Sequence, residues 1–228
     1  MDDPDRSDRR VWLVTGAGGR VGSALCRTLA PDNHVVAAYR TALPDAVSSL
    51  QRFVDPLAPG RPLPENAHPV YAVRADLTVP ADVDRLVEVA LARHGMIDVV
   101  VDAVGLLPAV AAPRRLALAV ARRAWAGRDE ENRHRRRHVV NVATCGALGA
   151  LDPAAVDRAT RVLAGELERW GVRANVVAAA AGVPAARVVD AVVRLDVGRA
   201  TGRVLAVDAR GRRLVDPHAD IEGDGGRP

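Results

Sequence analysis

The sequence predicts an α/β fold built on a doubly wound parallel sheet of about seven strands. Short apolar segments alternate with amphipathic segments of helical spacing along nearly the whole chain. The segment Ile97–Val101 is apolar without interruption, which is typical of a strand covered on both faces. Such alternation favours parallel strands joined by helical crossovers.

The length of 228 residues suits a single α/β domain. We place this domain at residues 11–210, between a polar N-terminal tail at 1–10 and a polar C-terminal tail at 211–228. Apolar residues make up 49% of the chain but aromatic residues only 3%, so the core must consist mainly of Ala, Val and Leu.

Each expected element rests on local signals. Pro31 ends the first helix, the apolar positions after residue 80 recur with helical spacing, and Asp152 followed by Pro153 is typical of a helix start. The expected strands are Val11–Val14, His34–Tyr39, Val70–Val73, Ile97–Val101, Val139–Val142, Asn175–Ala178 and Val204–Val207. The expected helices are Gly22–Ala30, a weak one near Asp45–Phe53, Ala81–His94, Leu116–Trp125, Pro153–Trp170 and Ala185–Leu195.

The strongest motif is the glycine-rich segment VTGAGGRVG, residues 14–22, between the first strand and the first helix. Gly16, Gly19 and Gly22 are spaced so that the backbone can approach a pyrophosphate, and the helix start beyond them offers free N–H groups. This context predicts a Rossmann-type dinucleotide site that includes Arg20 and Val21.

The residue at the end of the second strand indicates whether the dinucleotide is NAD(H) or NADP(H). Sites for NAD usually hold the ribose 2′-hydroxyl with an acidic residue there, but this chain has Arg40. Arg40 and Arg20 together suit a 2′-phosphate, because guanidinium groups bind phosphate in forked geometry. The sequence therefore favours NADP(H) over NAD(H).

Composition excludes several other functions. The chain contains no lysine, so Schiff-base chemistry is absent. The histidines show no metal-ligand spacing, so we expect no metal. The charged N-terminus has no signal-peptide pattern, and no apolar run reaches the ~20 residues of a membrane span. Two cysteines suggest a reduced, cytoplasmic protein.

The basic segment Arg133–His138 is the densest charge run. It precedes a strand, so we expect it at the sheet edge opposite the cofactor. No aromatic residues are interleaved for base stacking, and Asp129, Glu130 and Glu131 lie close by in sequence. We expect a solvated loop rather than a partner contact or a nucleic-acid site.

Taken together, these motifs resemble the short-chain dehydrogenase/reductase family from about Val11 to Asp208. TGAGGRVG is similar to the family's TGxxGxxG turn, and Ala75-Asp76-Leu77 resembles the motif whose Asp contacts adenine. The tetrad Asp102-Ala103-Val104-Gly105 stands where the family has NNAG. The resemblance adds Asp76, Leu77, Ala103 and Gly105 to the expected cofactor site.

The resemblance fails at the family's catalytic residues. Its Tyr and Lys positions correspond to Gly149 and Pro153, and the only tyrosines are Tyr39 and Tyr71. Thr144 takes the place of the Ser. We name Thr144 and Asp102 as the candidate catalytic residues, whereas Asp152 is better explained as a helix cap and Cys145 as a buried structural thiol.

The family's substrate lid is reduced here to Ala181–Pro184. Three functions remain open: a biosynthetic enzyme with a small-molecule substrate and no Tyr/Lys mechanism, an inactive subunit, or an NADP(H) sensor. The helix 153–170 resembles the one that packs family dimers, so we expect a homodimer or a heteromer through it. Loss of the cofactor also remains open.

Overall fold

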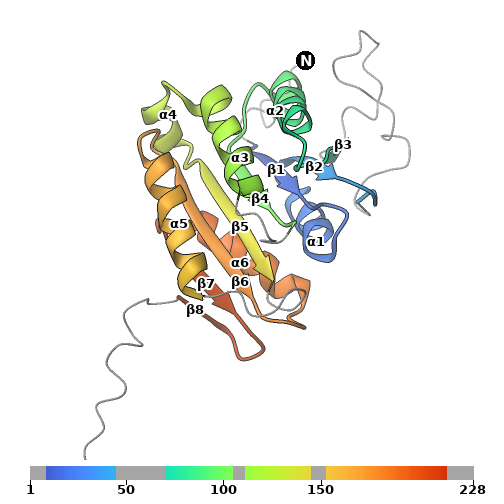
Figure 1. Cartoon of the computed structure of the whole chain (residues 1–228). Coiled ribbons are helices and arrows are strands. Elements are labelled where there is room, and N and C mark those ends of the chain that lie inside the picture. Colours follow the sequence, from blue (N-terminus) through green and yellow to red (C-terminus); the bar gives the residue numbers. More distant parts are fainter. Residues whose placement is uncertain (1–8, 45–69, 105–110, 145–152, 215–228) are drawn as a thin grey trace, which may run out of the picture.

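A computed structural model describes residues 9–44, 70–104, 111–144 and 153–214, without the side chains of residues 111, 112, 144 and 153. Over these residues the chain forms one sheet in the order β3-β2-β1-β4-β5-β6-β7-β8 (Figure 1). All neighbouring strands from β3 to β7 pair in parallel, and β8 pairs antiparallel with β7. The predicted doubly wound parallel sheet is confirmed.

Strands and helices alternate as expected. The strands are β1 Val11–Thr15, β2 His34–Tyr39, β3 Val70–Arg74, β4 Val99–Asp102, β5 His138–Thr144, β6 Arg173–Ala179, β7 Val204–Val207 and β8 Arg212–Leu214. The helices are α1 Arg20–Leu29, α2 Pro80–His94, α3 Ala111–Val120, the π-helix η4 Ala121–Trp125, α4 Asp129–His134, α5 Pro153–Glu168 and α6 Ala185–Val197.

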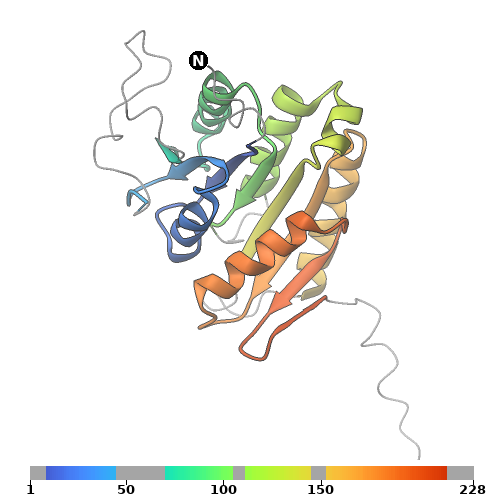
Figure 2. The same cartoon turned by 180° about the vertical axis from the view of Figure 1, so that it is seen from behind.

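The core lies in two layers, one on each face of the sheet. On one face, α2, α3, η4 and α5 pack against alternate residues of the strands, such as Leu13 and Val100. On the other face, α1 and α6 cover the intervening residues, such as Val14 and Val101 (Figure 2). Because both faces are covered, the central strands can be apolar at every position.

The fold extends beyond the expected elements in two places. The helix expected from Leu116 already begins by Ala111, and its last turn is the π-helix η4. The sheet also extends beyond residue 210, into the expected polar tail, because β8 pairs with β7 after a turn at Asp208–Gly211. All three β8 residues are exposed, so no apolar pattern marks this strand. The weak helix expected near Asp45–Phe53 lies outside the described residues.

The basic segment Arg133–His138 lies at the amino-terminal edge of the sheet, as expected, but the prediction of a solvated loop holds only in part: Arg133, His134 and Arg136 are exposed, and the first two belong to α4. Arg137 and His138 are buried, and Arg135 forms a two-pronged ion pair with the buried Asp98 (2.6 and 3.0 Å). The Arg136 guanidinium donates to the carbonyl of Gly198 (3.0 Å). Burial of these charges depends on partners far away in sequence, which local composition cannot reveal.

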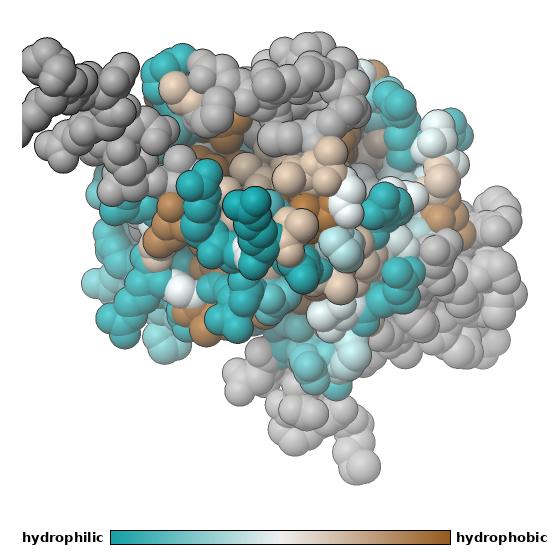
Figure 3. Space-filling model, turned by 90° about the horizontal axis from the view of Figure 1, so that it is seen from below, coloured by the Kyte–Doolittle hydropathy of each residue, from teal (hydrophilic) through white to brown (hydrophobic). Residues whose placement is uncertain are grey.

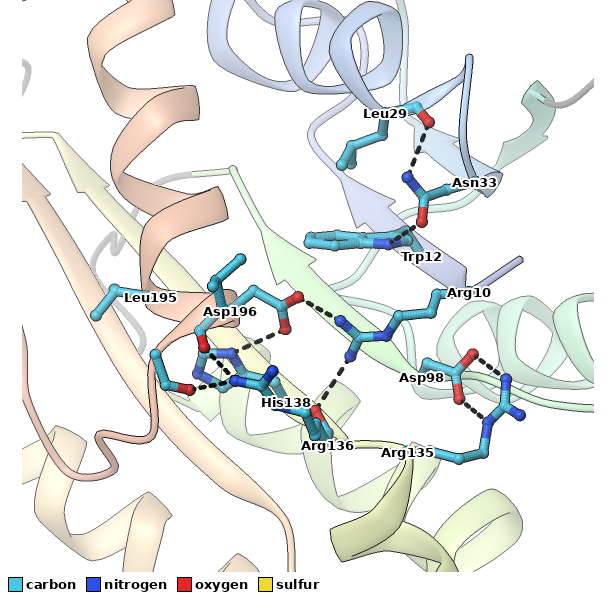
Figure 4. A network of polar contacts seen from close by, with 12 residues as sticks. Arg10, Trp12, Leu29, Asn33, Asp98, Arg135, Arg136, His138, Leu195 and Asp196 are labelled. Atoms are coloured by element: carbon cyan, nitrogen blue, oxygen red, sulfur yellow. Dashed lines mark hydrogen bonds and ion pairs between the residues drawn. The ribbon is translucent and has the colours of Figure 1, made fainter. Parts of the chain in front are cut away.

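The same edge joins the first and last thirds of the chain. Arg10, just before β1, forms an ion pair with Asp196 near the end of α6 (Figure 4). Asp196 also lies 3.4 Å from His138 Nδ1 at the start of β5. This edge is therefore occupied by structural polar contacts, whereas the opposite edge carries the candidate site.

Candidate functional site

The glycine-rich turn follows β1 and leads into α1 as the motif requires. Gly16 has a φ of +64°, and a Cβ there would lie 2.7 Å from the backbone of Ala103. A Cβ on Gly22 would lie 2.2 Å from the Gly16 carbonyl oxygen. The turn is thus too tightly packed on its own backbone to accept side chains at these positions.

The start of α1 offers hydrogen-bond donors. Its N-cap, Gly19, forms no side-chain cap, and the first-turn amides of an α-helix have no partner inside the helix. Together with the positive end of the helix dipole, these amides suit an anion such as a pyrophosphate. The Val21 side chain is half-buried and packs against the core, so only the backbone of Val21 can contribute to such a site.

A cavity of about 390 Å³ opens beside this turn, at the carboxyl ends of β1 to β4. Ligands of open α/β sheets bind at this edge. Figure 3 views the molecule from this side, where polar and apolar residues are interspersed. The lining residues are Thr15, Gly16, Gly18, Gly19, Ala38–Ala42, Ala75–Thr78, Asp102–Val104 and Pro113.

Most of the sequence-predicted cofactor residues that the structure describes meet at this cavity. Gly16, Gly19, Arg40, Asp76, Leu77 and Ala103 line it. Arg20 is exposed at the first position of α1 and is not among the lining residues. Gly105 lies outside the described residues.

Asp76 is held in a fixed orientation. Its Oδ1 accepts hydrogen bonds from the Thr78 amide (2.9 Å) and the Thr78 hydroxyl (2.7 Å), while its own amide donates to Asp82 Oδ2 (2.8 Å). The hydrogen bonds from Thr78 hold the pKa of Asp76 below its usual value. An ionised, fixed carboxylate can accept a hydrogen bond from an amino group such as that of adenine.

Asp102 lies at the inner wall of the cavity and is only 3% exposed. Its Oδ1 accepts hydrogen bonds from the Thr15 hydroxyl (2.6 Å) and the Val104 amide (3.1 Å). Burial raises the pKa of Asp102. These contacts tie the ends of β1 and β4 together, so the geometry assigns Asp102 a positioning role.

The region of the family's catalytic residues is only partly described. Thr144 is the last residue of β5, and Pro153 is the first residue of α5, but the side chains of both fall outside the described residues. Gly149, Cys145 and Asp152 also lie outside the described residues. Neither tyrosine replaces the missing one: Tyr71 is buried under the Arg93 guanidinium, and Tyr39 is half-buried at the end of β2.

The reduced lid is confirmed. Between the end of β6 and the start of α6 stand only residues 180–184, with Gly182 at a φ of +76° and Val183 buried. A turn of this length cannot act as a lid over the carboxyl edge of the sheet.

Three site residues were missed in the sequence. Thr78 follows Asp76 by two positions, a spacing typical of a local side-chain turn, and this signal could have identified it. Asp82 and Thr15 carry no such signal, because their partners are set by the helix and strand packing.

Among the residues that the structure describes, no group of three or more His, Cys, Asp or Glu side chains is placed to hold a metal ion. None of the helices within those ranges is long and apolar enough to cross a membrane.

No protein-family model and no curated protein matches the chain. Solved structures do match. A short-chain dehydrogenase from Mycobacterium avium aligns with a TM-score of 0.67 at 21% identity, over 92% of this chain and 85% of that one. An NADH-dependent reductase A1-R′ complexed with NAD aligns with a TM-score of 0.61 at 18% identity, over 89% of this chain and 96% of that one.

A blue fluorescent protein from a metagenomic library, in complex with NADPH, aligns with a TM-score of 0.62 at 22% identity, over 87% of this chain and 96% of its own. These alignments span nearly the whole of the described domain. The chain therefore has the Rossmann-type fold of the short-chain dehydrogenases/reductases.

Proposed function

We propose that this protein binds NADP(H) at the carboxyl-end cavity and does not use the Tyr/Lys mechanism. The observation that carries the proposal is the convergence on one cavity of the glycine-rich turn, the fixed carboxylate of Asp76 and the cation Arg40. No other described cavity joins a glycine-rich turn to a helix start. The neighbours complexed with NAD and with NADPH support a dinucleotide but differ in which one.

Each part of the cavity has a share in binding. The amides at the start of α1 bind the pyrophosphate, Asp76 and Leu77 bind the adenine, and Arg40 contacts the 2′-phosphate. The backbone at Ala103 lies beside the ribose on the nicotinamide side of the dinucleotide. When bound, the nicotinamide ring supplies or accepts a hydride.

Proton transfer must differ from the family's. The chain has no lysine to lower a tyrosine pKa, and the turn at residues 180–184 is too short to cover the site. General acid–base catalysis needs a positioned group with a tuned pKa. We propose a biosynthetic enzyme whose small-molecule substrate needs no proton from a tyrosine, with Thr144 and Asp102 as its candidate catalytic residues; a purely NADP(H)-sensing role is the alternative.

The test is a titration of the purified protein with NADPH and NADH, followed by calorimetry and nicotinamide fluorescence. We expect micromolar binding of NADPH, tighter than that of NADH, and a tenfold or greater loss of NADPH affinity in Arg40→Ala. Arg199→Ala, an exposed arginine near the opposite edge, is the matched control and should change nothing. Absence of binding to both nucleotides overturns the proposal.

A second candidate is an inactive subunit that pairs through α5. Val162 on this helix is 59% exposed, and Arg114 of α3 braces the same helix through an ion pair with Glu166. We place the pairing at this face of α5, with either a second copy or an active relative as the partner. Light scattering of wild type and Val162→Glu tests this: a dimer that the variant dissociates supports it, and a monomeric wild type that co-purifies with no relative refutes it.

A further inference from the structure

A groove of about 640 Å³ lies at the amino-terminal edge of the sheet, away from the dinucleotide cavity. It is formed by the end of α4, the second half of α5, the start of β6 and the connection from α6 to β7. Its charged lining residues are one glutamate and four arginines: Glu168, Arg133, Arg161, Arg173 and Arg203. None of these residues lines the cavity at the opposite edge.

Small residues line the groove beside these arginines. A Cβ added to Gly202 would lie 3.6 Å from the Ala164 Cβ, and one added to Gly165 would meet nothing within 4 Å. No aromatic ring is among the lining residues, so the groove offers no surface on which a nucleobase could stack. Its shape and its charge suit an extended peptide with carboxylate side chains.

Two of the arginines form no ion pair with any residue that the structure describes. The stem of the exposed Arg133 lies over Gly171, where a Cβ would be 2.9 Å from Arg133 Cγ. Arg203, also exposed, is fixed through its backbone amide, which donates to Asn175 Oδ1 (2.9 Å). Both guanidinium groups are therefore placed at the groove by neutral contacts.

The other two arginines are engaged within the fold. Arg161 pairs with Asp157 one turn earlier on α5. Arg173 donates to backbone carbonyl oxygens at the end of α6 (2.8–3.1 Å). The Thr201 hydroxyl accepts the Ala174 amide (3.1 Å), so its own proton can be donated to a carboxylate in the groove.

The sheet directs the last segment of the sequence toward this groove. β8 is antiparallel to β7, so it runs back to the amino-terminal edge, and it ends at Leu214, opposite Leu205. Arg203 precedes Leu205 by two residues, which span roughly 7 Å along a strand. Residues 215–228 are thus attached to the protein beside the groove, and each residue of an extended chain spans about 3.3 Å.

The segment 215–228 has the charge that the groove lacks. Its sequence, VDPHADIEGDGGRP, contains a single arginine and four carboxylates, at Asp216, Asp220, Glu222 and Asp224. Carboxylates accept forked hydrogen bonds from guanidinium groups. Exposed ion pairs are individually weak, but attachment close to the groove gives the segment a high effective concentration there.

We propose that the groove binds the acidic segment 215–228 of the same chain, and that its carboxylates contact Arg133 and Arg203. The sequence analysis gave this segment only the description of a polar tail. The contact is independent of the dinucleotide site, because it lies at the other edge of the sheet.

The first experiment follows removal of the segment from the full chain by an endoproteinase that cleaves before aspartate, with intact mass as the readout. We expect cleavage before Asp220 and Asp224 to be at least fivefold faster in the double variant Arg133→Gln/Arg203→Gln than in wild type. The matched control is Arg122→Gln, which removes an exposed arginine of η4 outside the groove and should leave the rate within twofold. Glutamine keeps the first part of the arginine stem, and thermal melting checks that the variants fold.

Salt and dilution define the contact further. In about 0.5 M NaCl the wild-type rate should approach that of the double variant, because salt screens exposed charges. Tenfold dilution of the protein should not change the rate, because the contact lies within one chain. Equal rates in wild type and double variant overturn the proposal. Protection that disappears on dilution also overturns it, since a second copy would then supply the segment.

The second experiment measures binding of a synthetic peptide of residues 215–228 by fluorescence anisotropy. The full chain is compared with a variant whose own segment is neutralised by Asp216→Asn, Asp220→Asn, Glu222→Gln and Asp224→Asn. We expect the peptide to bind this variant at least fivefold more tightly than wild type, whose groove is occupied, and to lose that affinity when Arg133→Gln and Arg203→Gln are added. Equal affinity for wild type and the neutralised variant overturns the proposal.

Discussion

Asp102 shows how one buried carboxyl can link two strand ends. The hydroxyl of Thr15 and the amide of Val104 both donate to its Oδ1, and only 3% of the residue is exposed. Burial disfavours the charged form and so raises the pKa of Asp102. A carboxyl whose pKa is raised on folding contributes its stability at low pH and loses it as the pH rises through the folded-state value.

Asp102→Asn is therefore expected to stabilise the protein at pH 8. The amide oxygen can still accept from Thr15 and Val104, but no charge is buried. We expect the free energy of unfolding in urea to be higher than that of wild type at pH 8 and nearly equal to it at pH 3. A loss of stability at pH 8 would mean that the ionised carboxylate has a partner in the fold.

His138 is the second residue whose titration matters. Its Nε2 lies 2.8 Å from the Asn175 side-chain amide, which donates, so the ring proton belongs on Nδ1, toward Asp196. Burial lowers the pKa of His138 to about 4, despite the opposing effect of Asp196. The folded protein therefore holds this ring neutral.

Stability should fall as the pH drops from 6.5 to 4, because the unfolded chain takes up a proton at His138 that the folded chain does not. Over that window the expected loss is roughly 3 kcal/mol. Urea unfolding at pH 7, 5.5 and 4.5 measures it. In His138→Gln, which keeps a polar side chain, the slope should flatten; an unchanged slope assigns the effect to other groups.

At the scale of elements, two helical glycines are expected to respond in opposite ways. An added Cβ at Gly22 in α1 would meet the Gly16 carbonyl oxygen at 2.2 Å, whereas one at Gly165 in α5 meets nothing within 4 Å. Both positions would gain helix propensity from alanine. The backbone contact must outweigh this gain at Gly22, because the glycine-rich turn has no room to move.

We expect Gly22→Ala to destabilise the protein by about 1–3 kcal/mol and Gly165→Ala to stabilise it by about 0.5–1 kcal/mol. Thermal and urea unfolding of both variants measure the difference. If Gly22→Ala left the free energy of unfolding unchanged, the glycine-rich turn would be looser than described. The close approach of Gly16 to Ala103 would then not be needed for stability.

Some failures of the sequence predictions are explained at the level of helices and strands. Periodicity identified the strands and helices whose apolar residues face the core. It missed β8, because all three of its residues are exposed and its place is set by backbone pairing with β7. It also missed the π-helix turn at Ala121–Trp125, where the fully buried Trp125 donates to the Ile97 carbonyl oxygen (2.7 Å).

Across the whole molecule, the two edges of the sheet have separate tasks. The amino-terminal edge holds the partly buried ion pairs of Arg135 with Asp98 and of Arg10 with Asp196. The carboxyl-terminal edge holds the glycine-rich turn and the adjoining cavity. Changes at one edge should therefore leave the other intact.

Arg135→Gln tests this separation. Removing the guanidinium leaves the fully buried Asp98 without its closest cation, and we expect a loss of about 3 kcal/mol in the free energy of unfolding. The affinity for NADPH, measured in the same preparation below its melting temperature, should stay within twofold of wild type. A large change in affinity would show that the two edges are coupled through the sheet.

The sequence by itself determined the alternation of strands and helices, the place of the glycine-rich turn and the absence of a Tyr–Lys pair. These are encoded within a few neighbouring residues or in composition, because helix and strand periods, turn chemistry and the lack of lysine need no partner. It also predicted six of the cofactor residues that line the carboxyl-end cavity, since the ends of parallel strands meet at one edge.

Only the tertiary structure decided which polar residues meet. Asp102 reaches Thr15 across 87 positions of sequence, Arg135 reaches Asp98 across 37, and Arg74 reaches Arg40 across 34. An arginine looks the same in sequence whether it is solvated, buried in an ion pair or directed at a ligand. Its role follows from which strands pair and in which register, and that is settled by packing of the whole sheet.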